Sequence, residues 1–217
     1  MTWAQVHAFS QGLDLLVPDA EPEASFNIAP TQSVWTIIGE NEGASAQQLR
    51  WGLVPSWARD IKVGSALINA RIETVAEKPS VRSAWKTRRC VVPASGYYEW
   101  RPEGGIKQPY WIHDSAQPML MFGGIWENWK TPEGEWLRSF AIITTAAGDD
   151  MVELHDRTPL MLSCDVLNAW LHAGADEAMA IAMSAPLPDL AWHPVSRAVG
   201  NPRSNGAKLI EPITPAA

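Results

Sequence analysis

The sequence has few cysteines, no long apolar run and no basic residue before Arg50. Its two cysteines, Cys90 and Cys164, do not form a CxxC pair, so the sequence supports neither a disulfide framework nor a cysteine-rich zinc site. No apolar run approaches the length of a membrane span, and the start MTWAQVHAFSQGL lacks the positively charged region of a secretory signal. We therefore expect a cytoplasmic protein without a membrane partner.

Several common catalytic and repeat signatures are also missing from the sequence. It contains no Gly-rich phosphate loop, no GxSxG elbow and no HExxH helix. Its twelve tryptophans do not recur at a fixed period, which argues against a solenoid or a propeller. Nothing in the sequence implies a metal ion or an organic cofactor, and we expect neither.

The composition is that of a globular domain. With 217 residues, 46% hydrophobic and 19% charged, the chain is long enough for one sizeable core, and we expect a single domain over residues 1–217. β-branched and aromatic residues predict strands at 33–39, 47–54, 65–73, 88–95 and 139–147. Gly-containing turns predict hairpins over 96–114 and 125–142.

Helices are predicted over 80–87 and 163–174. In the second helix we expect Ser163 to act as the N-cap and Gly174 to end the helix. Because the helices and strands do not alternate as βαβ units would, the sequence predicts an α+β fold.

Charge is unevenly distributed along the chain. The net charge is −7, but residues 50–107 hold eleven basic and five acidic residues, while both flanks are acidic. A basic middle third is able to form one positive face, as nucleic-acid binding requires, although closeness in sequence does not ensure closeness in space. In the same region Trp51 and Trp57 accompany Arg50 and Arg59, and aromatic faces beside cations suit both single-stranded nucleic acid and sugars.

Three short stretches carry candidate chemistry. In LINARIET (67–74), a strand would point Asn69, Arg71 and Glu73 to one side, which fits either a polar cleft floor or an ordinary solvent-facing strand. In GYYEW, Glu99 lies between aromatic residues, which tend to raise the pKa of a carboxyl group toward neutral pH. In ELHDRTPLML, His155 precedes an apolar run and is suited to proton exchange near pH 7, or to an ordinary structural role.

Six motifs in the same order closely resemble the SOS-response-associated peptidase family, the abasic-site-processing proteins. They are FNIAPTQ, WGLVPSW, INARIET, RRCVVPASGYYEW, ELHDRTPLML and WHPVSRAVGN, within residues 26–211. The resemblance implies one α+β domain, with a mixed, mainly antiparallel sheet forming a barrel-like core and with flanking helices. It also implies a positive cleft for single-stranded DNA carrying abasic sites, and covalent trapping of those sites by the protein's own N-terminus, with autopeptidase and lyase activity as further options. We expect a monomer.

The resemblance assigns roles by motif. Asn69 positions the reacting groups, Glu99 is the general acid and base, and His155 assists opening of the sugar ring. The residues that would hold phosphates or shape the cleft are Arg71, Arg157, Arg197, Pro30, Trp57, Trp100 and Thr145. Glu73 is expected to pair with a neighbouring arginine.

The chain departs from the family at its start. Members begin Met-Cys-Gly-Arg, and after loss of Met the cysteine amine and thiol close a ring on the sugar aldehyde; here the start is MTWAQ. We expect Cys90 and Cys164 to be core residues rather than substitutes. Three explanations stay open. The natural start of the protein differs from MTWAQ, or the Thr2 amine forms a reversible imine after loss of Met1, or the protein is a catalytically impaired relative that only binds DNA.

Two alternatives come from other classes of protein. A glycoside hydrolase would use Glu99 and Asp156 as its carboxylate pair, with tryptophans as the sugar platform. A protein-interaction module would use the same tryptophans as anchors. The six ordered motifs favour the abasic-site-processing family over both.

Overall fold

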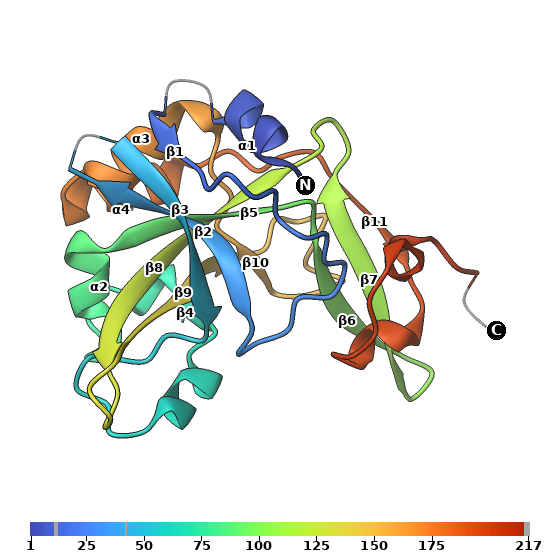
Figure 1. Cartoon of the computed structure of the whole chain (residues 1–217). Helices are drawn as coiled ribbons and strands as arrows, with labels where there is room; N and C mark the ends of the chain where they lie inside the picture. Colours follow the sequence, from blue (N-terminus) through green and yellow to red (C-terminus); the bar gives the residue numbers. More distant parts are fainter. Residues whose placement is uncertain (11–12, 42, 215–217) are drawn as a thin grey trace.

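Five strands form a closed barrel in the computed structural model, which describes residues 1–10, 13–41 and 43–214 (Figure 1). The strands are β2 (Ser33–Glu40), β3 (Gly43–Trp51), β5 (Arg89–Ala94), β8 (Leu120–Lys130) and β9 (Trp136–Ala146). Neighbours in the order β3-β2-β5-β8-β9 are antiparallel, and a parallel pairing of β9 with β3 closes the circuit. This mixed, mainly antiparallel barrel confirms the predicted α+β fold class.

Short strands extend this sheet, and a second sheet lies beside it (Figure 1). β1 (Leu15–Leu16) pairs with β3, whereas β4 (Asn69–Arg71) and β10 (Arg157–Pro159) both pair with β9. In this arrangement Thr144 of β9 lies opposite Arg71 of β4 and Pro159 of β10. The second sheet is antiparallel and consists of β6 (Tyr97–Glu103), β7 (Ile106–Asp114) and β11 (Leu190–Pro194).

Helices cover the outside of the barrel. They are α1 (Trp3–Phe9), α2 (Arg82–Thr87), α3 (Leu167–His172) and α4 (Ala175–Ser184), with 3-10 helices η1 (Ile61–Ala66), η2 (Ile72–Thr74), η3 (Cys164–Val166), η4 (Arg197–Gly200) and η5 (Ala207–Ile210). Trp85 of α2 and Trp170 of α3 pack edge to face, with their ring centroids 5.8 Å apart, in the outer core, which is the hydrophobic core between the helices and the barrel. Within the described part of the chain, no helix is both long and apolar enough to cross a membrane.

Alternate residues along each barrel strand enter two different cores, as the period of two requires. Along β9, Ala141 and Ile143 join the outer core that the helices cover, whereas Phe140 packs with Leu49 and Cys90 in the barrel interior. The barrel interior is therefore lined by the residues on only one face of each strand.

One end of the barrel is filled by polar side chains. Arg138 of β9 lies over the ring of Trp126 and donates hydrogen bonds to Asn128 and Gln47, while Gln47 also donates to Glu40. These hydrogen bonds tie together half-buried or exposed polar side chains of β2, β3, β8 and β9 at that end.

The structure confirms most predicted strands, shifts one to Gly43–Trp51 and shortens another. Strands 33–39, 88–95 and 139–147, and both hairpins, form as expected. The strand predicted at 47–54 ends at Trp51, because Gly52 has φ of +116° and a Cβ there would lie 2.6 Å from the Gly64 carbonyl oxygen. The strand predicted at 65–73 is limited to Asn69–Arg71 and is flanked by η1 and η2, since Asp60 caps η1 by accepting from the Lys62 N–H.

Two predictions about the segment 163–174 were wrong in detail. Ser163 occupies an N-cap position, but its side chain makes no capping hydrogen bond, and the segment starts as the 3-10 helix η3. Gly174 does not end α3; it is the N-cap of α4. Cys164 is exposed rather than in the core because it begins η3 at the surface, whereas Cys90 is buried as expected.

Candidate functional site

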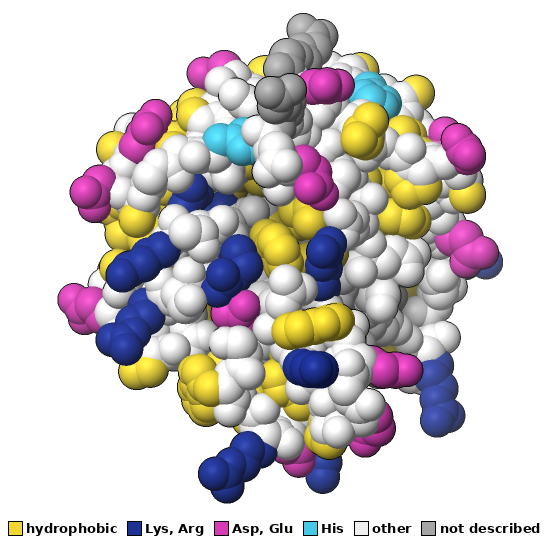
Figure 2. Space-filling view, turned by 60° about the vertical axis from the view of Figure 1, so that its left-hand side comes forward, with side chains coloured by type: hydrophobic (Ala, Val, Ile, Leu, Met, Phe, Trp, Pro, Cys, Tyr) yellow, Lys and Arg dark blue, Asp and Glu magenta, His cyan; other side chains and the backbone are white. Residues whose placement is uncertain are grey.

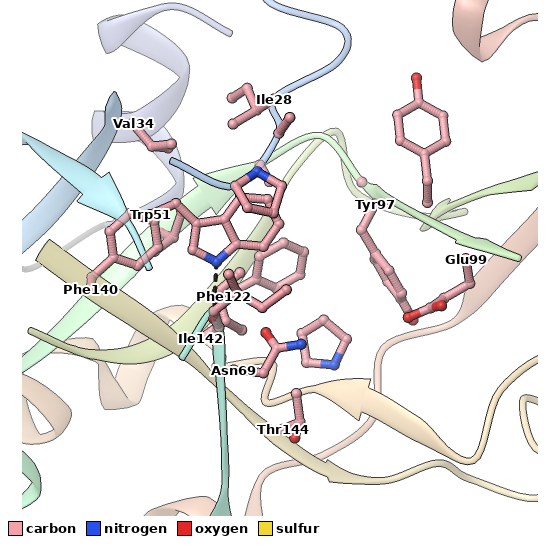
Figure 3. A pocket seen from close by; sticks show the side chains of 18 of the residues that line it. Ile28, Val34, Trp51, Asn69, Tyr97, Glu99, Phe122, Phe140, Ile142 and Thr144 are labelled. Atoms are coloured by element: carbon pink, nitrogen blue, oxygen red, sulfur yellow. Dashed lines mark hydrogen bonds between the residues drawn. The ribbon is translucent and has the colours of Figure 1, made fainter. Parts of the chain in front are cut away.

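A cavity of about 900 Å³ opens at the end of the barrel opposite the polar network. Its apolar wall comes from the barrel interior: Val34, Trp51, Phe122, Phe140 and Ile142 (Figure 3). Polar side chains from β4, β6 and β9 face the same space, including Asn69, Glu99 and Thr144. The site therefore combines a deep apolar recess with a polar rim, which is typical of a small-molecule or nucleotide pocket.

β4 brings Asn69 and Arg71 to the cavity. The short strand pairs with β9, and its period of two exposes these two residues while it buries Ala70. The indole N–H of Trp51 donates to the Ile68 carbonyl at 2.9 Å and fixes the chain just before Asn69 (Figure 3). Both side chains line the cavity, which is one of the two arrangements that the sequence left open for LINARIET.

Glu99 on β6 brings a carboxylate to the cavity, which Glu23 also lines. Burial raises its pKa, although His155 and a hydrogen bond from the Trp100 main chain act in the opposite direction. Its side chain keeps 25% of its surface exposed, so a substrate still has access to it. A carboxyl group in this setting is suited to take and return a proton near neutral pH.

His155 lies directly opposite Glu99. Its Nε2 is 3.9 Å from Glu99 Oε2, and its Nδ1 accepts the Arg157 main-chain N–H at 3.0 Å. In the neutral ring this contact places the proton on Nε2, the nitrogen that faces Glu99. The protonated ring is instead able to donate from Nδ1 to the Arg157 carbonyl, 3.1 Å away.

Arg157 is held by protein groups. Its guanidinium forms a two-pronged ion pair with Glu73, at 2.6 and 2.9 Å, and donates to the Thr144 carbonyl at 2.5 Å. The predicted pairing of Glu73 with a neighbouring arginine is thus confirmed, and the partner is Arg157. Within the described residues, Arg71 is exposed and forms no ion pair, so its charge is available to a ligand.

The remaining predicted residues divide into two groups. Pro30, Trp100 and Arg157 line the cavity together with Asn69, Arg71, Glu99 and His155. Trp57, Thr145, Arg197 and Thr2 are not among the described residues that line it. Trp57 is 63% exposed on the surface, and Thr144 rather than Thr145 faces the cavity on β9.

Thr2 serves as the N-cap of α1. Its side chain accepts the Gln5 main-chain N–H, and the Gln5 side chain accepts the Thr2 N–H at 2.9 Å, which completes a capping box. Met1, joined to it, does line the cavity. The start of the described chain therefore approaches the site through Met1.

The rim contains two loops that are distant in sequence. The side-chain amide of Asn27 donates to the carbonyls of Val199, Asn201 and Ser204 at 3.0–3.1 Å, and is buried between the loops. Tyr98 O–H also donates to the Phe26 carbonyl at 2.7 Å. These bonds hold residues 26–30 beside the second sheet.

The apolar recess was not predicted from the sequence. Phe140, Ile142 and Thr144 occupy alternate positions along β9, and this spacing indicates that their side chains share one face of the strand. Trp51 and Phe122 join that face only because β3 and β8 flank β9 in the closed barrel.

Of the alternative carboxylate pair, only Glu99 is among the described residues that line the cavity. Asp156 has 80% of its side chain exposed and is not among the described residues that line the cavity. Groups of three or more His, Cys, Asp or Glu suited to a metal ion do not occur within the described residues.

Comparisons with known proteins identify relatives across almost the whole chain. The sequence model of the family described as "SOS response associated peptidase (SRAP)" matches residues 3–202. The abasic site processing protein YoqW of Bacillus subtilis is 37% identical over 203 residues, with 92% of this chain and 91% of the relative covered. YedK of Escherichia coli, also named an abasic site processing protein, is 36% identical, with 90% and 87% covered.

A solved structure confirms the fold independently. A protein of Bacteroides thetaiotaomicron superposes with a TM-score of 0.75 at 26% identity, covering 85% of this chain and 82% of the other. The abasic site processing protein HMCES of Xenopus tropicalis is 33% identical, with 76% of this chain but only 56% of the relative covered.

Proposed function

Because the chain belongs to the SOS response associated peptidase family, we propose that it binds single-stranded DNA at the barrel cavity and processes abasic sites there. The observation that carries the proposal is the facing pair of His155 Nε2 and Glu99 Oε2, 3.9 Å apart in a cavity that Asn69 and Arg71 also line. This arrangement offers two proton-transfer groups, one amide for orientation and one free cation for a phosphate.

Opening of the abasic sugar is the first proposed step. The sugar is a cyclic hemiacetal whose aldehyde appears only when the ring opens. The protonated His155 ring gives its Nε2 proton to the ring oxygen and keeps its Nδ1 proton toward the Arg157 carbonyl, while the Glu99 carboxylate takes the proton of the C1′ hydroxyl and the bond from C1′ to the ring oxygen breaks. Asn69 orients the sugar by hydrogen bonding from its amide, since its side chain faces the same cavity.

Attack by an amine on the aldehyde is the second step. The amine nitrogen bonds to C1′ and one of its protons passes to the carbonyl oxygen, which becomes a hydroxyl. The bond from C1′ to this hydroxyl then breaks, and the nitrogen keeps one proton and the positive charge of the imine. Glu99 returns the proton it took to this leaving hydroxyl, so the step balances with one water formed. The proposed nucleophile is the N-terminal amine, on Thr2 after removal of Met1.

An imine has a second outcome besides trapping. Its positive charge acidifies the C2′ hydrogen, and loss of that proton expels the 3′ phosphate and cleaves the strand. A hydroxyl such as that of Thr2 closes a ring on the imine less readily than a thiolate does. The proposal therefore favours strand cleavage over a stable adduct wherever Thr2 supplies the amine.

The test is denaturing gel electrophoresis of the protein with a single-stranded oligonucleotide that carries one abasic site, with and without borohydride. A protein–DNA adduct trapped by borohydride, together with strand cleavage in its absence, supports the imine route. A heat-stable adduct without reductant indicates a ring-closing nucleophile, and peptide mapping by mass spectrometry identifies the residue. Absence of adduct and cleavage in both conditions would refute the catalytic proposal.

Glu99→Gln is the matched control for the same gel. The variant keeps the size and hydrogen-bonding capacity of the side chain but not its proton transfer. We expect it to bind the oligonucleotide and to form adduct at least about 100-fold more slowly, within the usual range for general acid–base catalysis. An unchanged rate would remove Glu99 from the mechanism.

A further inference from the structure

A row of cations begins at the rim of the cavity and continues away from it. It consists of Lys78, Arg82 and Lys86, all of them exposed. Lys78 precedes α2, and its carbonyl accepts the Arg82 N–H at 2.9 Å, so its main chain lies next to the first turn of the helix. Within α2, Arg82 and Lys86 are four residues apart and therefore lie one above the other, about 6 Å along the helix axis.

The row is continuous with the site. Lys78 lines the cavity together with Arg71, whereas Arg82 and Lys86 lie beyond it on α2. On the face that Figure 2 shows, Lys and Arg side chains gather toward the middle and most acidic ones lie near the edge. A ligand that leaves the cavity at Lys78 therefore meets further positive charge.

The charges of the row are not neutralised by neighbouring carboxylates. Among the described residues, Lys78, Arg82 and Lys86 take part in no ion pair, and Glu73 is engaged by Arg157. Glu77 is exposed next to Lys78 and, among the described residues, takes part in no ion pair.

The surroundings of the row suit phosphates rather than bases or apolar side chains. The buried residues of α2, Ala84 and Trp85, face the barrel. Between the cations, the exposed side chains are Pro79, Ser83 and Thr87, and none of them offers an aromatic face for stacking. Evenly spaced cations without aromatic neighbours recognise a repeated negative charge, as the sugar-phosphate backbone presents it.

We propose that this row binds the phosphates of the DNA strand beyond the abasic nucleotide and so extends the binding surface from the cavity along α2. The inference rests on the proposed function, because the strand must first enter the cavity. Each bound phosphate releases condensed counterions, so every cation of the row adds to the salt dependence of binding. The row accordingly selects for strand length and not for base sequence.

The test compares Arg82→Gln/Lys86→Gln with the matched control Lys107→Gln/Lys130→Gln. Both variants lose two exposed positive charges, and neither pair lines the cavity. Fluorescence anisotropy measures Kd against salt concentration for two abasic oligonucleotides: one long enough to reach α2, and one of a few nucleotides that fills only the cavity. Circular dichroism verifies that each variant is folded.

On the long strand, we expect the row variant to flatten the slope of log K against log salt by about 1.4, since each single-strand contact contributes about 0.7. The control variant should keep the wild-type slope, and the short strand should bind both variants equally. Equal slopes for the row variant and the wild type on the long strand would overturn the inference. If the wild type binds neither strand, the proposed function fails instead, and the two failures are thereby distinguished.

Discussion

The carboxylate of Glu73 is hydrogen bonded to the guanidinium of Arg157, so a phosphate would have to displace that carboxylate in order to bind Arg157. The family resemblance assigned Arg157 to phosphate binding, but in the free protein both of its terminal nitrogens contact Glu73. Arg157 in turn supplies the main-chain N–H that fixes His155. Under the proposed function, Glu73 would compete with a DNA phosphate for the guanidinium of Arg157, the residue whose main-chain N–H positions His155.

Glu73→Gln should tighten single-stranded DNA binding and steepen its salt slope by about 0.7, because the variant leaves the charge of Arg157 uncompensated. The variant should lose only about 1 kcal/mol of unfolding free energy, since Glu73 is half exposed and such ion pairs are screened. Glu77→Gln is the control: it changes the net charge equally at a nearby exposed residue. If both variants alter DNA binding by the same amount, Arg157 does not reach the DNA.

The raised pKa of Glu99 predicts a pH-dependent stability. Because burial raises this pKa above its ordinary value of 4.5, the folded protein binds more protons than the unfolded chain between the two values. Unfolding free energy therefore falls as pH rises through the folded-state pKa. Glu99→Gln mimics the neutral carboxyl and lacks this loss.

Thermal unfolding of the wild type and of Glu99→Gln from about pH 4 to about pH 8 should show this difference. We expect the wild type to lose Tm relative to the variant as pH increases, with the change centred above 4.5. Glu103, a carboxylate of the same strand whose pKa is instead lowered from 4.5, is the control: its contribution changes only below that value, so Glu103→Gln should differ from the wild type by a nearly constant Tm as pH rises above it. A constant Tm difference between wild type and Glu99→Gln would mean that the Glu99 pKa is the same in both states.

At the level of residues, the sequence predicted the polar part of the cavity better than the apolar part. Asn69, Arg71, Glu99 and His155 stand in short motifs, and the structure brings all four to one cavity. Whether they have the assigned roles stays a prediction. The apolar wall depends on which strands become neighbours, and short motifs do not carry that information.

Arg89 joins two helices to the barrel at the scale of secondary-structure elements. It is 2% exposed and donates to the carbonyls of Trp85, Lys86, Trp170 and Ala173, in the last turns of α2 and α3. Its guanidinium carbon lies 6.0 Å from the rings of both Trp85 and Trp170. The negative ends of two helix dipoles thus surround one buried cation.

Arg89→Met should lower the unfolding free energy by on the order of 3 kcal/mol, because it leaves several buried carbonyls without a donor. Arg89→Lys keeps the charge but cannot reach the same set of carbonyls, so we expect a smaller loss that is measurable even if the Met variant does not fold. Urea denaturation measures both, and the exposed Arg82→Met should change stability by less than about 0.5 kcal/mol. Wild-type stability in Arg89→Met would show that the helix ends need no such donor.

The prediction of elements failed where tertiary contacts override local preference. Residues 65–73 have the alternation of a strand, but only Asn69–Arg71 find a partner in β9. Beyond Arg71 the chain enters η2, which directs Glu73 toward Arg157. No local pattern in the sequence marks the point at which a partner strand ends, so the length of β4 was not predictable.

The whole molecule is a barrel with two different ends. Polar side chains around Arg138 fill one end, and the other opens into the cavity. Hydrophobic alternation predicted the strands, but the parallel pairing of β3 with β9 joins residues about ninety positions apart and was not readable from the sequence. The family resemblance supplied the barrel, because that closure is a property of the fold and not of any single segment.

Asn27 links the two ends of the chain across the cavity rim, because its amide binds three carbonyls of residues 199–204. Asn27→Ala should cost about 2 kcal/mol, and hydrogen exchange should accelerate in residues 24–30 and 199–205 while the barrel strands keep their protection. We expect slower adduct formation with an unchanged pH profile, since the rim and not the Glu99–His155 pair is altered.

Asn205→Ala, which removes one rim bond to the Phe26 N–H, is the milder control. Uniformly faster exchange across the barrel would instead make Asn27 a determinant of global stability, and unchanged exchange in both loops would show that the rim is held by other contacts.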